Sequence, residues 1–260
     1  MELYYEIQGN GRPVILVHSG GADLRDWTYV APLLAKDYKV IIFDGRGAGK
    51  SPDPKEDVNY VEDLKALLDH LKIPKAAIVG HSMGGQIATD FALEYHEKVS
   101  ELVLIAPALS GFNYSLEFLT YINKVSEAAP DIDNMIEVSL SAPSYCVVQS
   151  GPKRELAENM LRHHINRTFQ WPDFKIIWPE PPAAERLGEL TAKTLFMIGT
   201  EELPDNVRVA DYFRQHSNAK ITEIPGADHM ATLTHPKELT HFITAFMEDD
   251  IYDATNTRRE

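Results

Sequence analysis

Ser82 is the side chain in this sequence best placed to act as a nucleophile. It lies in the stretch AAIVGHSMGGQ at residues 76–86, where a short apolar run ends in the pattern G-x-S-x-G. The apolar run predicts a strand, and the small and apolar residues at 86–92 predict a helix. Glycine on both sides permits a tight turn with close neighbours, which would lift the serine hydroxyl clear of a sheet.

The same turn would supply half of an oxyanion-binding site. The backbone N–H of Met83 opens the predicted helix, where the positive end of the helix dipole lies. The alternative interpretation is a glycine-rich turn that ends a buried strand, with Ser82 as the helix N-cap. Because G-x-S-x-G also occurs by chance, its strand-to-helix context and the rest of the chain must decide between the two.

Short apolar runs alternate with helical patterns on both sides of Ser82. The runs lie at residues 14–17, 40–43, 102–105, 194–198 and 220–224, and the helical patterns at 23–35, 61–71, 206–216 and 236–247. This alternation predicts an α/β fold with a mostly parallel sheet and helices on both faces. Loops at the carboxyl ends of the strands would then present the reactive side chains.

The alternation stops between residues 110 and 189, where helical patterns, many aromatic residues and several prolines replace the apolar runs. We expect this segment to be a helical cap inserted into a core formed by residues 1–109 and 190–250. Its aromatic side chains would either line the site or build the small core of the cap. Residues 251–260 are expected to form a polar C-terminal tail.

The composition excludes several classes of partner. A net charge of −14 argues against nucleic acid or an anionic membrane. No apolar run approaches the roughly 18 residues of a membrane span, and the N-terminal residues lack the pattern of a secretory signal. The single cysteine, Cys146, fits a reducing compartment, so we expect a cytoplasmic protein. Metal-binding and nucleotide-binding motifs are missing from the sequence, so we expect neither a metal nor a cofactor.

Four motifs together resemble the α/β-hydrolase fold family, in its small form with a helical cap. They are the oxyanion-loop motif at residues 18–21, the D-x-R-G-x-G-x-S motif at 44–51, the serine turn at 80–84, and the histidine segment at 225–229. The resemblance covers roughly residues 3–248. It implies a mostly parallel central sheet flanked by helices, an inserted cap and a Ser-His-acid catalytic triad.

The resemblance implies a role for each of three side chains. Ser82 would be the nucleophile, and His229 the base that accepts its proton. Glu202 occupies the position where the family usually carries aspartate, and would orient the imidazole and stabilise its charged form. Asp205 and Glu201 are the alternative acids.

The resemblance also places the second oxyanion donor at the backbone N–H of Gly20, next to that of Met83, with Gly21 as the alternative. His18 and Arg46 are expected to hold loops in place and to take no part in the chemistry.

These features together predict a serine hydrolase that cleaves a carboxylic ester, a lactone or a similar activated carbonyl of a small molecule through an acyl-enzyme. Residues 22–27 are similar to those of enol-lactone hydrolases. One alternative is a hydrolase of carbon–carbon bonds in diketone-type substrates, because the same triad serves both reactions. The other is a weakly catalytic receptor on the same fold. The sequence makes no prediction of the oligomeric state.

Overall fold

A seven-stranded sheet forms the centre of the protein, whose computed structural model describes residues 2–256, with side chains over residues 2–248. The spatial order of the strands is β1-β3-β2-β4-β5-β6-β7. Only β1 runs antiparallel to its neighbour; the other pairs are parallel. The strands are β1 (Tyr5–Gln8), β2 (Pro13–Val17), β3 (Lys39–Phe43), β4 (Ala76–His81), β5 (Val99–Ile105), β6 (Lys193–Gly199) and β7 (Lys220–Ile224).

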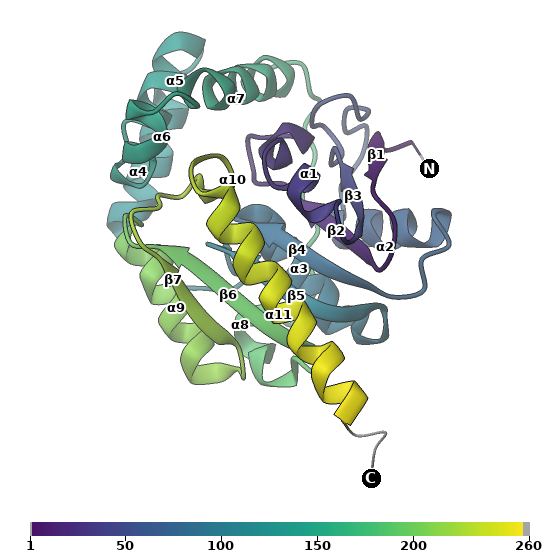
Figure 1. Cartoon of the computed structure of the whole chain (residues 1–260). Coiled ribbons are helices and arrows are strands. Elements are labelled where there is room, and N and C mark those ends of the chain that lie inside the picture. The colour runs from purple at the N-terminus through teal and green to yellow at the C-terminus, as the bar shows by residue number, and fades with distance from the viewer. Residues whose placement is uncertain (1, 257–260) are drawn as a thin grey trace.

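Helices cover both faces of this sheet, as Figure 1 shows. The helices are α1 (Ala31–Leu34), α2 (Tyr60–His70), α3 (Met83–Glu94), α4 (Leu116–Glu127), α5 (Ile132–Leu140), α6 (Cys146–Ser150), α7 (Arg154–Thr168), α8 (Ala183–Arg186), α9 (Pro204–His216), α10 (Ala231–Thr234) and α11 (Pro236–Asn256). Short 3-10 turns are η1 (Leu24–Trp27), η2 (His96–Lys98), η3 (Pro143–Tyr145) and η4 (Leu187–Glu189).

The apolar runs are buried on both faces because successive side chains of a strand point to opposite sides. On β4, Ile78 packs in one core cluster with α2, α3, α8 and α9, whereas Val79 packs in another with α1 and α11. This explains why the strands read as continuous apolar sequence. The predicted parallel α/β sheet is confirmed.

Helices α4 to α7 follow β5 and precede β6, and they lie across the upper end of the sheet in Figure 1. The described part of the chain has no strand between residues 110 and 189. The two ends of this insertion meet at Ser110, whose hydroxyl and carbonyl oxygens accept from the N–H groups of Ala183 and Ala184. Division of the chain into a core and a cap remains a prediction that this geometry supports.

Two helical segments differ from the sequence prediction. Residues 23–35 form the short turns η1 and α1, because the side chain of Asp23 caps one turn and Pro32 starts the next. The last helix, predicted to end at residue 247, continues to Asn256 as α11, and residues 248–256 contain neither glycine nor proline to stop it. The predicted tail is therefore helical over 251–256, and residues 257–260 lie outside the described residues.

Across residues 2–256, no helix combines the length and apolar character needed to cross a membrane.

Candidate active site

Ser82 lies at the sharp turn between β4 and α3, with a backbone φ of +53°. This conformation is rare for residues other than glycine and costs about 1–3 kcal/mol. The flanking glycines are required by space: a Cβ on Gly80 would overlap the Gly84 carbonyl, and one on Gly84 would overlap the carbonyl oxygens of Val17 and His18. The turn therefore has the predicted geometry.

Ser82, His229 and Glu202 form a continuous hydrogen-bonded series. The Ser82 Oγ atom lies 2.9 Å from His229 Nε2, and His229 Nδ1 lies 2.8 Å from Glu202 Oε1. These contacts bring together loops after β4, β6 and β7, at sequence separations of 147 and 27 residues. The Glu202 side chain is fully buried, whereas the His229 side chain is 12% exposed and lines the same cavity as Ser82.

The two alternative acids lie elsewhere. Asp205 accepts hydrogen bonds from the backbone N–H and hydroxyl of Ser115 and pairs with Arg208. The side chain of Glu201 accepts a hydrogen bond from its neighbour Thr200. Of the three carboxylates, only Glu202 contacts His229.

Charge stabilises this His229–Glu202 pair. Burial alone would raise the pKa of Glu202, but the facing His229 and hydrogen bonds from His229 and Asn206 outweigh burial, so the Glu202 pKa lies below its ordinary value. Burial would lower the pKa of His229, but Glu202 and the more distant Asp228 and Asp26 raise it above 6.5. The acid is thus ionised, and the imidazole is a stronger base than a free histidine.

The two predicted oxyanion donors are neighbours. A Cβ built on Gly20 would lie 3.3 Å from the Met83 Sδ atom, so the loop after β2 lies directly against the start of α3. Within the described residues, no acceptor takes up the backbone N–H of Met83, Gly20 or Gly21. Both glycines therefore remain candidate donors beside Met83.

Sequence reasoning did not assign roles to Asn206, Asp26 and His81. Asn206 donates to Glu202 Oε2 and fixes the second oxygen of the acid. Asp26 and His81 form a fully buried pair with Nδ1 and Oδ2 2.8 Å apart. The position of His81 next to Ser82 was the one sequence signal for this pair. Its partner Asp26 lies 55 residues earlier, so the local sequence did not identify it.

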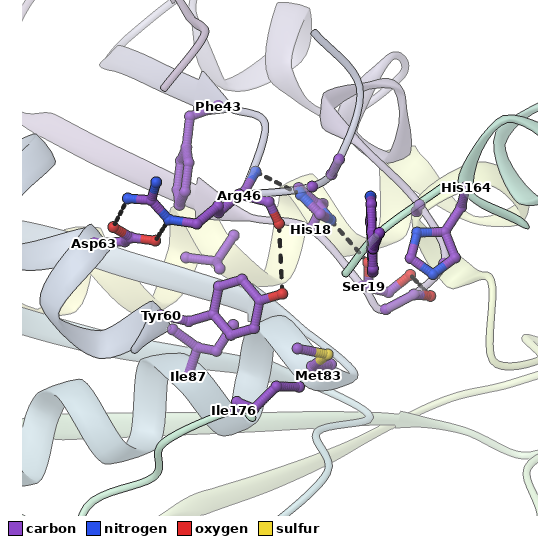
Figure 2. Close-up of a pocket in the computed structure, with 18 of the residues that line it drawn as sticks. His18, Ser19, Phe43, Arg46, Tyr60, Asp63, Met83, Ile87, His164 and Ile176 are labelled. Atoms are coloured by element: carbon purple, nitrogen blue, oxygen red, sulfur yellow. Dashed lines mark hydrogen bonds and ion pairs between the residues drawn. The ribbon is translucent and has the colours of Figure 1, made fainter. Parts of the chain in front are cut away.

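His18 binds the neighbouring loop after β3, and Arg46 binds helix α2. His18 Nε2 accepts from the Gly45 N–H at 3.0 Å, and its Nδ1 donates to the Ser19 carbonyl. The Arg46 guanidinium makes two hydrogen bonds to Asp63, at 3.1 and 2.6 Å. Both side chains line the cavity drawn in Figure 2.

Three cavities lie in series near the serine: the second borders the first at Tyr121, Ile122 and Tyr145, and borders the third at residues 19–22. The first, of about 140 Å³, includes Ser82 and His229. The second has a volume of about 250 Å³. The third, drawn in Figure 2, has a volume of about 210 Å³ and is lined by Gly20 and Met83 together with mostly apolar side chains. No group of three or more His, Cys, Asp or Glu side chains within residues 2–248 is arranged to bind a metal ion.

Comparison with known proteins finds one matching family model, described as the alpha/beta hydrolase fold, over residues 12–236. The chain is 28% identical over 220 residues to 2-hydroxy-6-oxo-6-phenylhexa-2,4-dienoate hydrolase of Comamonas testosteroni, covering 77% of this chain and 74% of that protein. It is 30% identical over 218 residues to the enzyme of the same name from Burkholderia cepacia, covering 75% and 72%. The fold is similar to the enol-lactonase of Burkholderia xenovorans LB400, with a TM-score of 0.75, 21% identity and coverage of 95% and 96%.

Proposed function

Because the chain belongs to the α/β-hydrolase fold family, we propose that it is a serine hydrolase that cleaves an ester or lactone of a small molecule. The observation that supports this most strongly is the Ser82–His229–Glu202 series, with its contacts of 2.9 and 2.8 Å. A nucleophile, a base and an orienting acid in hydrogen-bond contact are the arrangement that acyl transfer requires.

In the proposed reaction, His229 Nε2 removes the Ser82 proton as Oγ attacks the substrate carbonyl carbon. The N–H groups of Met83 and Gly20 stabilise the oxyanion of the tetrahedral intermediate. His229 then gives the proton to the leaving oxygen, and the acyl group remains on Ser82. A water molecule, deprotonated by His229, attacks the acyl-enzyme and releases the acid, with the proton returned to Ser82.

Glu202 supplies a fixed negative charge beside His229 throughout these steps. It is buried and ionised before the reaction begins, so its charge stabilises the imidazolium that forms when His229 accepts the proton. Asn206 donates to the other Glu202 oxygen and prevents the longer side chain from rotating away. This contact explains how glutamate can serve where relatives usually have aspartate.

The cavity of about 210 Å³ beside the oxyanion donors supports an uncharged, ring-sized group in the substrate. An engineered cavity of roughly 150 Å³ accommodates benzene. The only lysine or arginine among the described residues that line the three cavities is Arg46, and Asp63 neutralises it. A carboxylate bound there would lack a free counter-charge, which is costly in a buried site.

A second candidate is cleavage of a carbon–carbon bond next to a ketone. It is favoured by the two relatives named as hydrolases of 2-hydroxy-6-oxo-6-phenylhexa-2,4-dienoate. The same triad would attack the ketone, and the leaving group would be a carbanion in place of an alkoxide. An assay of the hydrolysis of that dienoate, measured as the loss of its absorbance, distinguishes this reaction from ester cleavage.

The test is hydrolysis of p-nitrophenyl acetate and butyrate by the wild type and by Ser82→Ala, Glu202→Gln and Asp205→Asn. We expect Ser82→Ala to abolish turnover, Glu202→Gln to lower kcat by about 10³–10⁴-fold, and Asp205→Asn to remain within about threefold of the wild type. Asp205 is the matched control because it is a nearby acid that bonds elsewhere.

Labelling by a fluorophosphonate tests the nucleophile without a substrate. We expect the wild type to be labelled at Ser82 and Ser82→Ala to remain unlabelled. A wild type that neither hydrolyses an ester nor reacts with the reagent would contradict the serine hydrolase and favour a receptor. Loss of activity in Asp205→Asn but not in Glu202→Gln would reassign the acid.

A further inference from the structure

We propose that Asp26 and His81 act as a buried, ionised positioning pair that fixes the oxyanion loop and the His229 loop relative to Ser82. The inference deepens the proposed serine-hydrolase function and rests on it. Both side chains have zero exposure, and neither contacts Ser82 Oγ. They are therefore positioning residues that act through the groups they bind.

With Asp26 ionised, the hydrogen bonds of His81 require both of its ring nitrogens to be donors. Nδ1 lies 2.8 Å from Asp26 Oδ2, and Nε2 lies 2.7 Å from the backbone carbonyl of His229. A carboxylate and a carbonyl can only accept, and an imidazole with two N–H groups is the charged imidazolium. Beside an ionised Asp26, the geometry therefore assigns a positive charge to His81.

Asp26 is equipped to stay ionised without solvent. Burial would raise its pKa, but His81 and hydrogen bonds from Thr232 and Ser19 lower it to about 2. Oδ2 accepts from the Ser19 N–H at 3.0 Å and from His81, and Oδ1 accepts from the Thr232 hydroxyl at 2.6 Å. Both oxygens are satisfied, which a buried carboxylate requires.

Apart from Thr232, the groups bound by the pair are next to a proposed reacting group or are part of one. Ser19 directly precedes the oxyanion residue Gly20, and His81 directly precedes Ser82. The carbonyl that His81 binds belongs to His229 itself, and the ring centroids of the two histidines are 5.3 Å apart. One ion pair thus joins the loop after β2, the turn after β4 and the loop after β7.

Stability alone is a poor explanation for this pair. Replacement of a buried ion pair by apolar residues of similar volume is often neutral or stabilising, because the desolvation of two charges is costly. The surrounding side chains include the fully buried Trp27, whose ring lies edge-on to His81. An apolar pair could fill this space, but it could not bind the N–H of Ser19 and the carbonyl of His229.

The experiment compares Asp26→Asn, His81→Asn and His81→Gln, with p-nitrophenyl butyrate as the probe and each protein assayed well below its own unfolding temperature. The amide nitrogen of asparagine can replace Nδ1 and that of glutamine can replace Nε2. His81→Gln therefore keeps a donor for the His229 carbonyl, whereas His81→Asn keeps only the donor for Asp26.

We expect Asp26→Asn and His81→Asn to lower kcat by about tenfold or more, with KM within about threefold, because the pair positions reacting groups and does not contact substrate. His81→Gln should recover most of the loss. The matched control is Asp23→Asn, because Asp23 is also buried but pairs with the partly exposed Arg25. It should leave kcat within about twofold.

The pH dependence of kcat/KM gives a readout that a purely structural role would not change. His229 is faced by Glu202, Asp228, Tyr145 and the Asp26–His81 pair. His81→Gln leaves the Asp26 charge uncompensated, so it should move the acid limb of the profile, which reports His229, to higher pH. Asp26→Asn removes a negative charge near His229 and should move this limb to lower pH.

The proposal is overturned if the variants unfold at lower temperature but keep wild-type kcat and an unchanged pH profile, or if His81→Gln loses as much activity as His81→Asn. If Asp26→Asn does not fold, the comparison of His81→Gln with His81→Asn still tests the proposal. A wild type without esterase activity or fluorophosphonate labelling would instead refute the proposed function, so the two failures are distinguishable.

Discussion

Replacement of Asp90 by asparagine should stabilise the protein at alkaline pH. Asp90 lies on α3 and is almost fully buried. Its Oδ1 accepts from the Ser110 hydroxyl at 2.8 Å, whereas Oδ2 is buried with no partner among the described residues. Burial raises the pKa of Asp90 to about 6, and the nearby Glu94 adds to this, while Ser110 and Arg186 oppose it.

The sign of the effect follows from the direction of this shift. A carboxyl with a raised pKa binds its proton more tightly in the folded state than in the unfolded state, where the value is 3.8. The resulting stability is fully present below about pH 4 and is lost as the pH rises through 6. A shift of this size corresponds to about 3 kcal/mol of unfolding free energy.

Asparagine is permanently neutral and retains an oxygen for Ser110. Its NH₂ group would take the place of the unpartnered oxygen, and a buried donor without an acceptor costs about 1 kcal/mol. We therefore expect Asp90→Asn to be more stable than the wild type by about 2 kcal/mol near pH 8. Near pH 4 the wild-type carboxyl is protonated, so only the cost of the unpartnered amide remains and the variant should be less stable than the wild type by about 1 kcal/mol.

Urea unfolding followed by circular dichroism at these two pH values measures the difference. The control is Asp211→Asn, an exposed aspartate on α9 paired with the exposed Arg214, which should change stability by less than about 1 kcal/mol at either pH. An Asp90→Asn protein that is less stable than the wild type near pH 8, or a difference that does not vary with pH, would refute the reasoning.

Two further predictions concern the site itself. The kcat/KM for a neutral ester should rise with pH through an apparent pKa above 6.5, because His229 acts in its unprotonated form and Glu202 raises its pKa; a limb below 6.5 in a pH–rate profile would contradict the pairing. Gly84→Ala should destabilise the protein by about 2–3 kcal/mol, because the new Cβ would overlap the carbonyl oxygen of Val17; a thermal unfolding midpoint equal to that of the wild type would show that this turn can relax.

The parts of the fold that follow a local rule were predictable from sequence. The run at residues 40–43 is part of β3, and the run at 102–105 is part of β5, as expected for short strands that are buried on both faces and therefore carry apolar residues in succession. The position of Ser82 followed from glycines that no larger residue could replace. The choice of Glu202 needed the resemblance to a family, since Asp205 and Glu201 lie in the same loop.

Long-range polar contacts were not predictable in the same way. Asp26 meets His81 across 55 residues and Thr232 across 206 residues, and nothing in the local sequence of any of them specifies the others. Asn206 was also missed, because its position on α9 gives no sign that its amide faces Glu202. The end of α11 was misplaced, since a polar composition does not stop a helix in the absence of glycine or proline.

The strained serine turn explains why such contacts gather around the site. A positive φ at Ser82 costs about 1–3 kcal/mol and persists only if surrounding bonds favour it. The Ser82 N–H donates to the Ile105 carbonyl at 2.9 Å, and the Ser82 carbonyl accepts from Gly85 and Ala108 at 2.9 and 3.0 Å. At about 1 kcal/mol each, these bonds to β5, to α3 and to the loop after β5 offset the strain. The loops that approach from the other side consist largely of small and polar residues with few apolar contacts, such as those of Ala22 and Met230, so hydrogen bonds such as those of Asp26 help to fix their positions relative to the turn.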